Sequence, residues 1–229
     1  MVERATDVVI TRVWDWPVRL VHWAIVVLLV TLVVTAKIGG NAMEWHVRAG
    51  EAMLALVLFR LIWGFVGTRH ARFSSFVRGP GAVLRYARSV VRPPHELHVG
   101  HNPLGGWMVI ALLLLLLLLV QACAGLFSND DVLTDGPLVR FISKDLSDTI
   151  SGFHIKNAWV IVALACAHIA AVMFYLLALK ENLIAPMLHG SKRLPSTHAS
   201  AVADRAGTVK AIALLALCGL GVWWLVTRR

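Results

Sequence analysis

Residues 154–179 read HIKNAWVIVALACAHIAAVMFYLLAL, a stretch that is apolar apart from its first positions and a second histidine. About 20 consecutive apolar residues are enough for a helix to cross a bilayer, so we expect a transmembrane helix here. His154 and His168 lie 14 residues apart. On a helix this is about 40° short of four turns, with a rise of about 21 Å. The two histidines therefore share one helix face at two depths.

Four other windows have the length and apolarity of membrane spans. They lie at residues 20–38, 45–66, 104–127 and 209–226, and residues 157–179 make the fifth predicted span. Of all residues 58% are apolar and 15% charged, and mean hydropathy is +0.72, whereas soluble domains carry about 25% charged residues. Backbone groups in lipid must bond internally. We therefore expect an all-α integral membrane protein, a four-helix transmembrane bundle plus a fifth C-terminal transmembrane helix, without a soluble Rossmann or barrel domain.

The distribution of charge predicts how the chain crosses the membrane. Lys and Arg number 22 against 13 Asp and Glu, and in a membrane protein such an excess indicates topology rather than nucleic-acid binding. With the N-terminus inside, 14 of the cations fall in inside segments and seven outside. The first twenty residues lack the pattern of a cleaved signal peptide. We expect a multi-pass protein of the bacterial inner membrane with a cytoplasmic N-terminus and a periplasmic C-terminus.

Two further histidines, His22 and His46, lie in or at the end of predicted spans. An ionisable side chain there is costly and suggests function. His46 opens the second span from the outer side, at the depth of His154. His22 lies 16 residues before the outer end of the first span, or about 24 Å below it, at the depth of His168. The sequence predicts two cross-helix pairs, His22 with His168 and His46 with His154.

Two stacked pairs of imidazoles are what two bis-histidine haem sites require, one ring nitrogen on each side of each iron. The chain has no Cys-x-x-Cys-His motif, so haem b is favoured over haem c. Its three cysteines are expected to be packing residues. A haem-free metal site or proton relay is the alternative use of paired membrane histidines, but only Glu51 lies well inside a span to support it.

Four basic residues near these histidines are candidates for haem propionates, which guanidinium groups bind through charge-assisted hydrogen bonds. Arg19 lies one turn before His22, and Arg60 falls near the inner depth. Arg48 and Lys156 each follow an outer histidine by two residues and are candidates at the outer haem. Contacts with lipid headgroups are the alternative for all four.

Several stretches resemble the bacterial cytochrome b561 family, which is similar to the b-type cytochrome subunits of nickel-iron hydrogenases. They are residues 13–23 (VWDWPVRLVHW), 44–67 (EWHVRAGEAMLALVLFRLIWGFVG), 69–80 (RHARFSSFVRGP), 100–107 (GHNPLGGW) and the helix with His154 and His168. The resemblance implies two non-covalently bound b haems, with ligands at His22, His46, His154 and His168. Residues 1–193 would form the dihaem domain, and 194–229 an inside loop and the fifth helix. His101 is expected in a tight turn, with a quinone or proton contact as its alternative.

The expected function is transmembrane electron transfer between the membrane quinone pool, ubiquinone or menaquinone, and a periplasmic redox partner such as a c-type cytochrome or a redox enzyme. An acidic outer loop would attract a basic partner; its carboxylates are Asp130, Asp131, Asp135, Asp145 and Asp148. The alternatives are a membrane-anchor subunit of a hydrogenase or dehydrogenase, and a haem-free metal or proton transporter. Whether the chain alone is an enzyme, and whether it forms a homodimer through its fifth helix, stays open.

Overall fold

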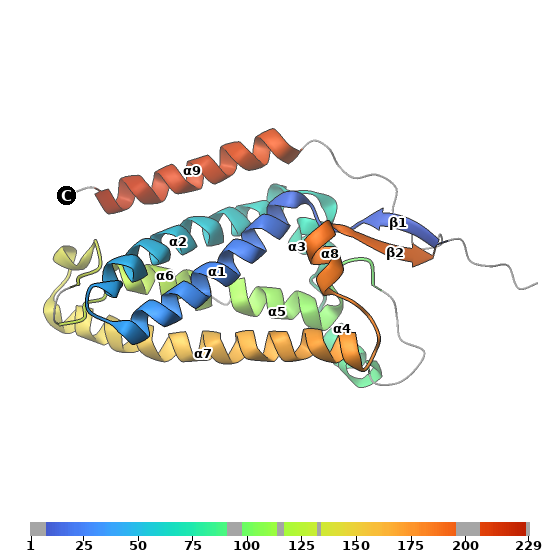
Figure 1. Ribbon diagram of the computed structural model, residues 1–229, viewed down its shortest axis with the longest axis horizontal. Helices are drawn as coiled ribbons and strands as arrows, with labels where there is room; N and C mark the ends of the chain where they lie inside the picture. Colours follow the sequence, from blue (N-terminus) through green and yellow to red (C-terminus); the bar gives the residue numbers. More distant parts are fainter. Residues whose placement is uncertain (1–7, 91–97, 114–116, 132–133, 196–206, 228–229) are drawn as a thin grey trace, which may run out of the picture.

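The computed structural model describes residues 8–90, 98–113, 117–131, 134–195 and 207–227, and most of these residues are helical. Long helices run side by side along the longest axis of the molecule (Figure 1). Those long and apolar enough to cross a membrane are α1 (Trp16–Ile38), α2 (Ala42–Val66), α7 (Lys144–Leu177) and α9 (Thr208–Thr227). The predicted all-α membrane bundle is confirmed.

The third predicted span corresponds to α5 (Pro103–Leu113) and α6 (Leu117–Leu126). Both pack along α7, and the residues between them, 114–116, lie outside the described part of the chain. The described part of the window at 104–127 is therefore helical almost throughout, as expected. Five cationic positions used to predict the topology also lie outside the described residues: Arg4, Arg92, Arg205, Arg228 and Arg229.

Helix α7 begins well before the predicted span, at Lys144 instead of residue 157. Ser143 caps its N-terminus, where the side chain accepts a hydrogen bond from the Leu146 amide. Asp145 in the first turn adds a favourable interaction with the helix dipole. A hydropathy window misses this polar first part because it continues the helix beyond the apolar segment.

One end of the bundle carries a two-stranded antiparallel sheet that the sequence did not predict, and we call it the sheet end (Figure 1). Strand β1 (Val8–Arg12) pairs with β2 (Ser191–Pro195), with Val8 opposite Pro195 and Arg12 opposite Ser191. The pairing joins the chain before α1 to the chain after α7. The short helices α3 (Phe73–Phe76), α4 (Pro80–Ser89) and α8 (Ile184–His189) and the 3-10 turn η1 (Arg69–Ala71) lie at this end.

The opposite end, where α6 passes to α7, is the α6–α7 end, and it carries the 3-10 turn η2 (Val139–Phe141). Helix α1 starts at the sheet end, and α9 finishes toward the α6–α7 end (Figure 1). The described chain thus starts and finishes at opposite ends of the bundle. That arrangement agrees with an odd number of membrane crossings.

Asp15 joins the start of α1 to the end of α2. One carboxylate oxygen caps α1 by accepting from the Val18 amide at 2.9 Å. The other accepts from the Trp63 indole N–H at 2.9 Å and from the Thr68 hydroxyl at 2.8 Å. Because Trp63 is buried, its indole N–H needs such an acceptor.

Gly64 lets the short helix α3 pack directly on α2. A Cβ atom at this position would lie 2.0 Å from Cε2 of Phe73, a buried ring. We expect Gly64→Ala to lower the free energy of unfolding by about 1–3 kcal/mol, because the ring must move within a packed core. Thermal unfolding in detergent measures this effect. The double variant Gly64→Ala/Phe73→Leu should recover part of the loss, and no recovery would contradict a clash with this ring.

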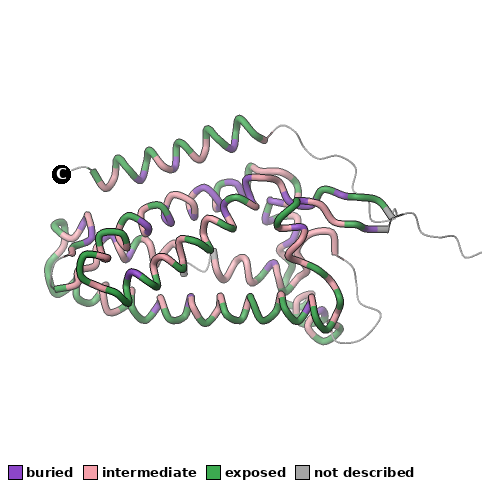
Figure 2. Tube along the Cα trace, viewed as in Figure 1, coloured by how far each residue is buried: buried purple, intermediate pink, exposed green. Residues whose placement is uncertain are grey.

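Much of the apolar surface of the long helices faces outward (Figure 2). Only 11% of the apolar window of α7 is buried, and side chains such as Val27 and Ile169 are about three-fifths exposed. Such a surface suits lipid rather than water. Helix α9 packs on α2 through Ala211, Cys218 and Val222, and the Lys210 ammonium donates to the carbonyl oxygen of Val66 at 2.9 Å. The fifth helix is thus an addition on the outside of α2.

Candidate haem sites

Two pairs of histidines meet between helices, in the combination that the sequence predicts. His22 of α1 faces His168 of α7 with ring centres 6.4 Å apart and ring planes at 61°. His46 of α2 faces His154 of α7 with ring centres 6.2 Å apart and planes at 74°. Because His154 and His168 are 14 residues apart on α7, the pairs are separated by about 21 Å along the helix.

The ring nitrogens of the second pair are oriented by backbone carbonyls. Nδ1 of His46 lies 3.0 Å from the Leu32 oxygen, and Nδ1 of His154 lies 3.0 Å from the Gln121 oxygen. A carbonyl only accepts, so each Nδ1 carries the proton, and the lone pair of each Nε2 is available to a metal. In the first pair, Nδ1 of His22 is buried without a hydrogen-bond partner.

The spacing of both pairs fits a haem iron. An imidazole nitrogen binds a transition metal at about 2 Å and lies about 1 Å from its ring centre, so axial rings on one iron have centres about 6 Å apart. Both measured separations match this value. Within the described part of the chain, no three His, Cys, Asp or Glu side chains are grouped to hold a metal ion.

The packing of the helices also suits such a group. Helix α1 packs closely on α2, and α7 packs on α6 and α5. Among the described residues, neither α1 nor α2 forms an extensive backbone contact with α7, although their histidines meet its histidines. The histidine pairs therefore lie where α7 stands apart from α1 and α2, whereas α2 packs closely on α6.

Arg60 is the buried cation of the first site. It is only 4% exposed, its guanidinium lies 5.2 Å from the ring centre of Phe73, and its Nη1 has no hydrogen-bond partner. Asp15 is the carboxylate that acts on it electrostatically. A buried guanidinium with a free donor suits an anionic ligand group such as a propionate.

Arg19 lies near the start of α1, at the sheet end, and it also has a donor without a partner. Its Nη1 donates to the carbonyl oxygen of Leu188 at the end of α8, while its Nε is buried without a partner. Gly190, with a φ of +84°, brings the chain close to this guanidinium. Arg19 and Arg60 thus each keep a buried donor without a partner, and their role as propionate ligands stays a prediction.

The structure does not bring Arg48 or Lys156 to the second pair. Arg48 forms an ion pair with Glu44 one turn earlier on α2, and its guanidinium lies 5.5 Å from the ring centre of Trp45. The Lys156 side chain is exposed. Both placements suit the headgroup contact that the sequence left as their alternative.

His101 is a further candidate, which the sequence assigned to a tight turn with a quinone or proton contact as its alternative. Its ring packs between those of Trp14 and Phe76, with both centre distances 4.5 Å, and its Nδ1 is buried and unpartnered. Burial, followed by the charge of Arg60, lowers the pKa of His101 to about 3, with smaller contributions from His168 and His22. The imidazole is therefore neutral at physiological pH and sits beside the first pair. In the sequence, the GHNPLGGW turn at residues 100–107 is the feature that marks His101 as a candidate.

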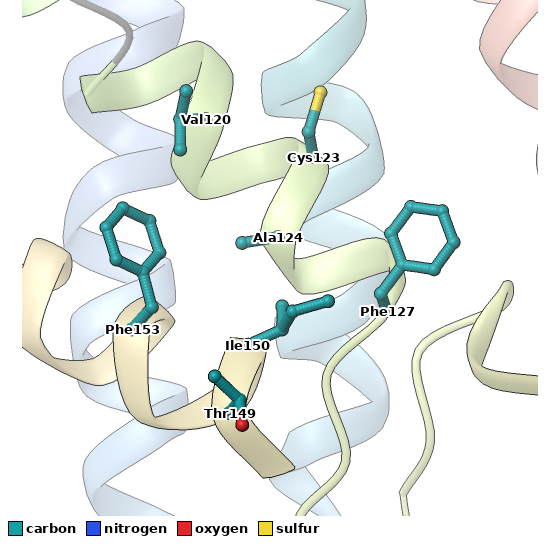
Figure 3. Close-up of a pocket in the computed structure, with 7 residues that line it drawn as sticks. All are labelled: Val120, Cys123, Ala124, Phe127, Thr149, Ile150 and Phe153. Atoms are coloured by element: carbon teal, nitrogen blue, oxygen red, sulfur yellow. The ribbon is translucent and has the colours of Figure 1, made fainter. Parts of the chain in front are cut away.

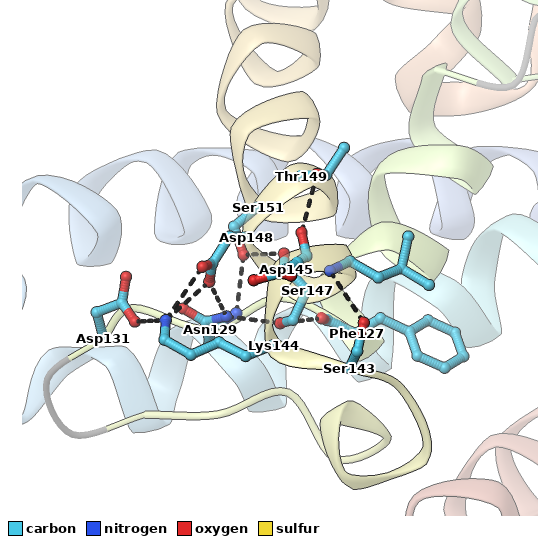
Figure 4. A network of polar contacts seen from close by, with 11 residues as sticks. Phe127, Asn129, Asp131, Ser143, Lys144, Asp145, Ser147, Asp148, Thr149 and Ser151 are labelled. Atoms are coloured by element: carbon cyan, nitrogen blue, oxygen red, sulfur yellow. Dashed lines mark hydrogen bonds and ion pairs between the residues drawn. The ribbon is translucent and has the colours of Figure 1, made fainter.

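A polar network fixes the connection between α6 and α7 (Figure 4). The Asn129 amide donates to the Ser147 hydroxyl at 2.6 Å and to Asp148 at 2.9 Å. Ser147, fully buried, donates to the Phe127 carbonyl at 2.8 Å. Lys144 binds both Asp131 and Asp148. Two of the five carboxylates expected to make this loop acidic therefore share one lysine, and the loop keeps a net negative charge.

An apolar groove of about 490 Å³ lies between α6 and α7 near the second pair (Figure 3). Its lining residues are Val120, Cys123, Ala124, Phe127, Thr149, Ile150 and Phe153. The Thr149 hydroxyl already donates to the Asp145 carbonyl. The groove offers apolar contact, as to an acyl chain, and little for a polar group to bind.

Because Gly125 of α6 has no side chain, the His154 ring can pack closely against α6. A Cβ atom at this position would lie 3.2 Å from Cε1 of His154. We expect Gly125→Val to displace that ring and to perturb only the haem signal that also depends on His46, leaving the signal that depends on His168 intact. Reduced-minus-oxidised spectra of the purified variant measure this, and an equal loss of both signals would contradict a local effect.

Comparison with known proteins agrees with this geometry. The family described as prokaryotic cytochrome b561 matches residues 13–190, which include both histidine pairs. The chain belongs to this family. It is thus a multi-pass membrane cytochrome of the b type, with haem b as its cofactor and electron transfer as its function. Membership replaces the haem-free transporter that the sequence alone left open.

Named relatives of this cytochrome are b-type cytochrome subunits. A probable Ni/Fe-hydrogenase B-type cytochrome subunit of Bradyrhizobium diazoefficiens is 22% identical over 221 residues, covering 83% of this chain and 89% of the relative. The probable Ni/Fe-hydrogenase 1 B-type cytochrome subunit of Escherichia coli K12 is also 22% identical, covering 83% and 94%. The Rhizobium leguminosarum counterpart is 24% identical, covering 83% and 92%. No solved structure matches the chain significantly.

Proposed function

We propose that this cytochrome binds two b haems, one between His22 and His168 and one between His46 and His154. The observation that carries the proposal is the pair of ring separations, 6.4 and 6.2 Å, at two depths along the same helix α7. A b haem held by the two imidazoles of a pair would supply reversible one-electron exchange. Arg60 and Arg19 would hold its propionates at the first site, and His101 would close that site against water.

The two pairs lie at different depths along α7, so they connect the two faces of the membrane. We place the sheet end at the cytoplasm, because described cations on and around it outnumber described carboxylates and cytoplasmic loops carry excess Lys and Arg. The N-terminus is then cytoplasmic, the C-terminus periplasmic, and the membrane is the bacterial inner membrane. Electrons would pass between the quinone pool, ubiquinone or menaquinone, and a periplasmic acceptor or donor such as a c-type cytochrome.

Haem quantification of the purified chain tests the first part of this proposal. A pyridine haemochrome assay should give two b haems per chain, and one haem would mean that one histidine pair has another role. For the second part, a water-soluble quinol should reduce the haems, and a c-type cytochrome should then reoxidise them. Haems that no quinol reduces would contradict the link to the quinone pool.

A second candidate function is membership of a hydrogenase complex, with the periplasmic partner a redox enzyme. It is favoured by the three relatives, each named as a probable hydrogenase cytochrome subunit. Purification of the chain from its native membranes in mild detergent distinguishes the two. A hydrogenase that copurifies and reduces the haems with H₂ would support the complex, whereas haems that respond only to quinol and c-type cytochrome would support the first function.

A further inference from the structure

The segment after α2 has a composition that the haem sites do not use. Residues 67–95 contain no Asp, Glu or Lys, yet they contain six arginines. A preference for positive loops alone is met by Lys as well as Arg. Arginine without lysine instead suits phosphate, because the planar guanidinium donates two parallel hydrogen bonds to a phosphate group.

Helix α4 within this segment is anchored to the bundle by one face. The buried Tyr86 hydroxyl lies 2.8 Å from the Tyr175 hydroxyl of α7, and α4 also packs on α5. Just before α4, the Arg78 carbonyl accepts from the Trp107 indole N–H at 2.8 Å. Trp107 is 40% exposed, and tryptophan is enriched at the level of lipid headgroups.

The other face of α4 presents cations beside an apolar side chain. Arg85 and Arg88 are exposed, and Leu84, one turn before Arg88, is 52% exposed. This is the composition of a helix that lies in the membrane interface, with leucine toward acyl chains and arginine toward phosphates. Exposed arginines continue this surface before the helix, at Arg72 and Arg78.

No carboxylate neutralises these guanidinium groups in the described part of the sheet end. The carboxylates described there are Asp15 and Glu181. Asp15 is held by Trp63 and Thr68, and Glu181 forms an ion pair with Lys192. Among the residues that the structure describes, the arginine surface thus has positive charge that no carboxylate compensates.

From these observations we propose that Arg85 and Arg88 of α4, together with Arg78, form a binding site for the phosphate of an anionic phospholipid. The site commits to lipid because Leu84 and Trp107 flank it at acyl and headgroup level. It lies apart from both histidine pairs and does not depend on their role.

Lipid-dependent thermal stability of the haem-loaded full chain tests this site. In nonionic detergent, the Tm increment with phosphatidylglycerol should be about three times the increment with phosphatidylcholine. The reason is that a ligand that binds the folded state stabilises it. The variant Arg85→Gln/Arg88→Gln should lose most of that difference. The matched control Arg12→Gln/Arg193→Gln, which removes two exposed cations from β1 and β2 of the same end, should keep it.

Three results would overturn the proposal. They are equal Tm increments with the two lipids for the unmodified chain, an equal loss in both double variants, and inorganic phosphate reproducing the phosphatidylglycerol increment. The last would assign the surface to a free anion rather than to a lipid. Counting phosphatidylglycerol retained per chain by mass spectrometry gives a second readout, in which only Arg85→Gln/Arg88→Gln should show fewer bound lipids.

Discussion

His168→Ala is expected to reduce the haem content of the purified cytochrome from two to about one per chain. The His22 and His168 rings are spaced for one shared iron, and a b haem has no covalent link to keep it in place when an axial ligand is lost. His22→Ala should remove the same spectral component. His46→Ala and His154→Ala should instead remove the other component, because these rings form the second pair.

The control for this series is His189→Ala, an exposed histidine at the end of α8 that should change neither component. Pyridine haemochrome content and low-temperature reduced spectra are the measurements. If His22→Ala and His46→Ala abolished one common component, the pairing across helices would be wrong, whatever the total haem content.

Asp15→Ala is expected to destabilise the fold most among single changes outside the histidine pairs. It removes the cap of α1 and leaves the Trp63 indole N–H and the Thr68 hydroxyl without their acceptor. It also removes the carboxylate that acts on the buried Arg60. Loss of such partners costs about 3 kcal/mol or more, because the remaining groups stay buried and uncompensated.

Thermal unfolding of the haem-loaded chain in detergent measures the effect of Asp15→Ala. Asp15→Asn should be less harmful, since an amide oxygen can still accept a hydrogen bond while the charge is lost. A change below about 0.5 kcal/mol for Asp15→Ala, the size of an ordinary surface substitution, would contradict the role of Asp15 as the link between α1 and α2.

The membrane spans and the pairing of the histidines could be predicted because both depend on simple periodicities. Apolar length sets the spans, and helical rise and rotation set which histidine lies at which depth. The pairing follows from depth, because α1 runs antiparallel to α7 and α2 runs parallel to it, so His22 meets His168 and His46 meets His154. The ligand roles themselves remain predictions for the haem measurements.

Other features depend on contacts between distant parts of the chain. Strands β1 and β2 are five residues each and pair Val8 with Pro195, a partner that no local pattern identifies. His101 lies at the first site because its ring packs between the rings of Trp14 and Phe76. Arg48 follows His46 by two residues, which suggested a propionate ligand, but its guanidinium forms an ion pair with Glu44 one turn earlier on α2.

Helix α7 supplies one histidine to each pair, while the partners come from two different helices, α1 and α2. Under the proposed haem assignment, this one helix would set the distance between the two redox centres. The groups around each centre come from other parts of the chain: Arg60 and His101 near the first pair, and the carbonyl oxygens of Leu32 and Gln121 near the second. Substitutions around these groups would change the driving force between the centres without altering the distance an electron must travel.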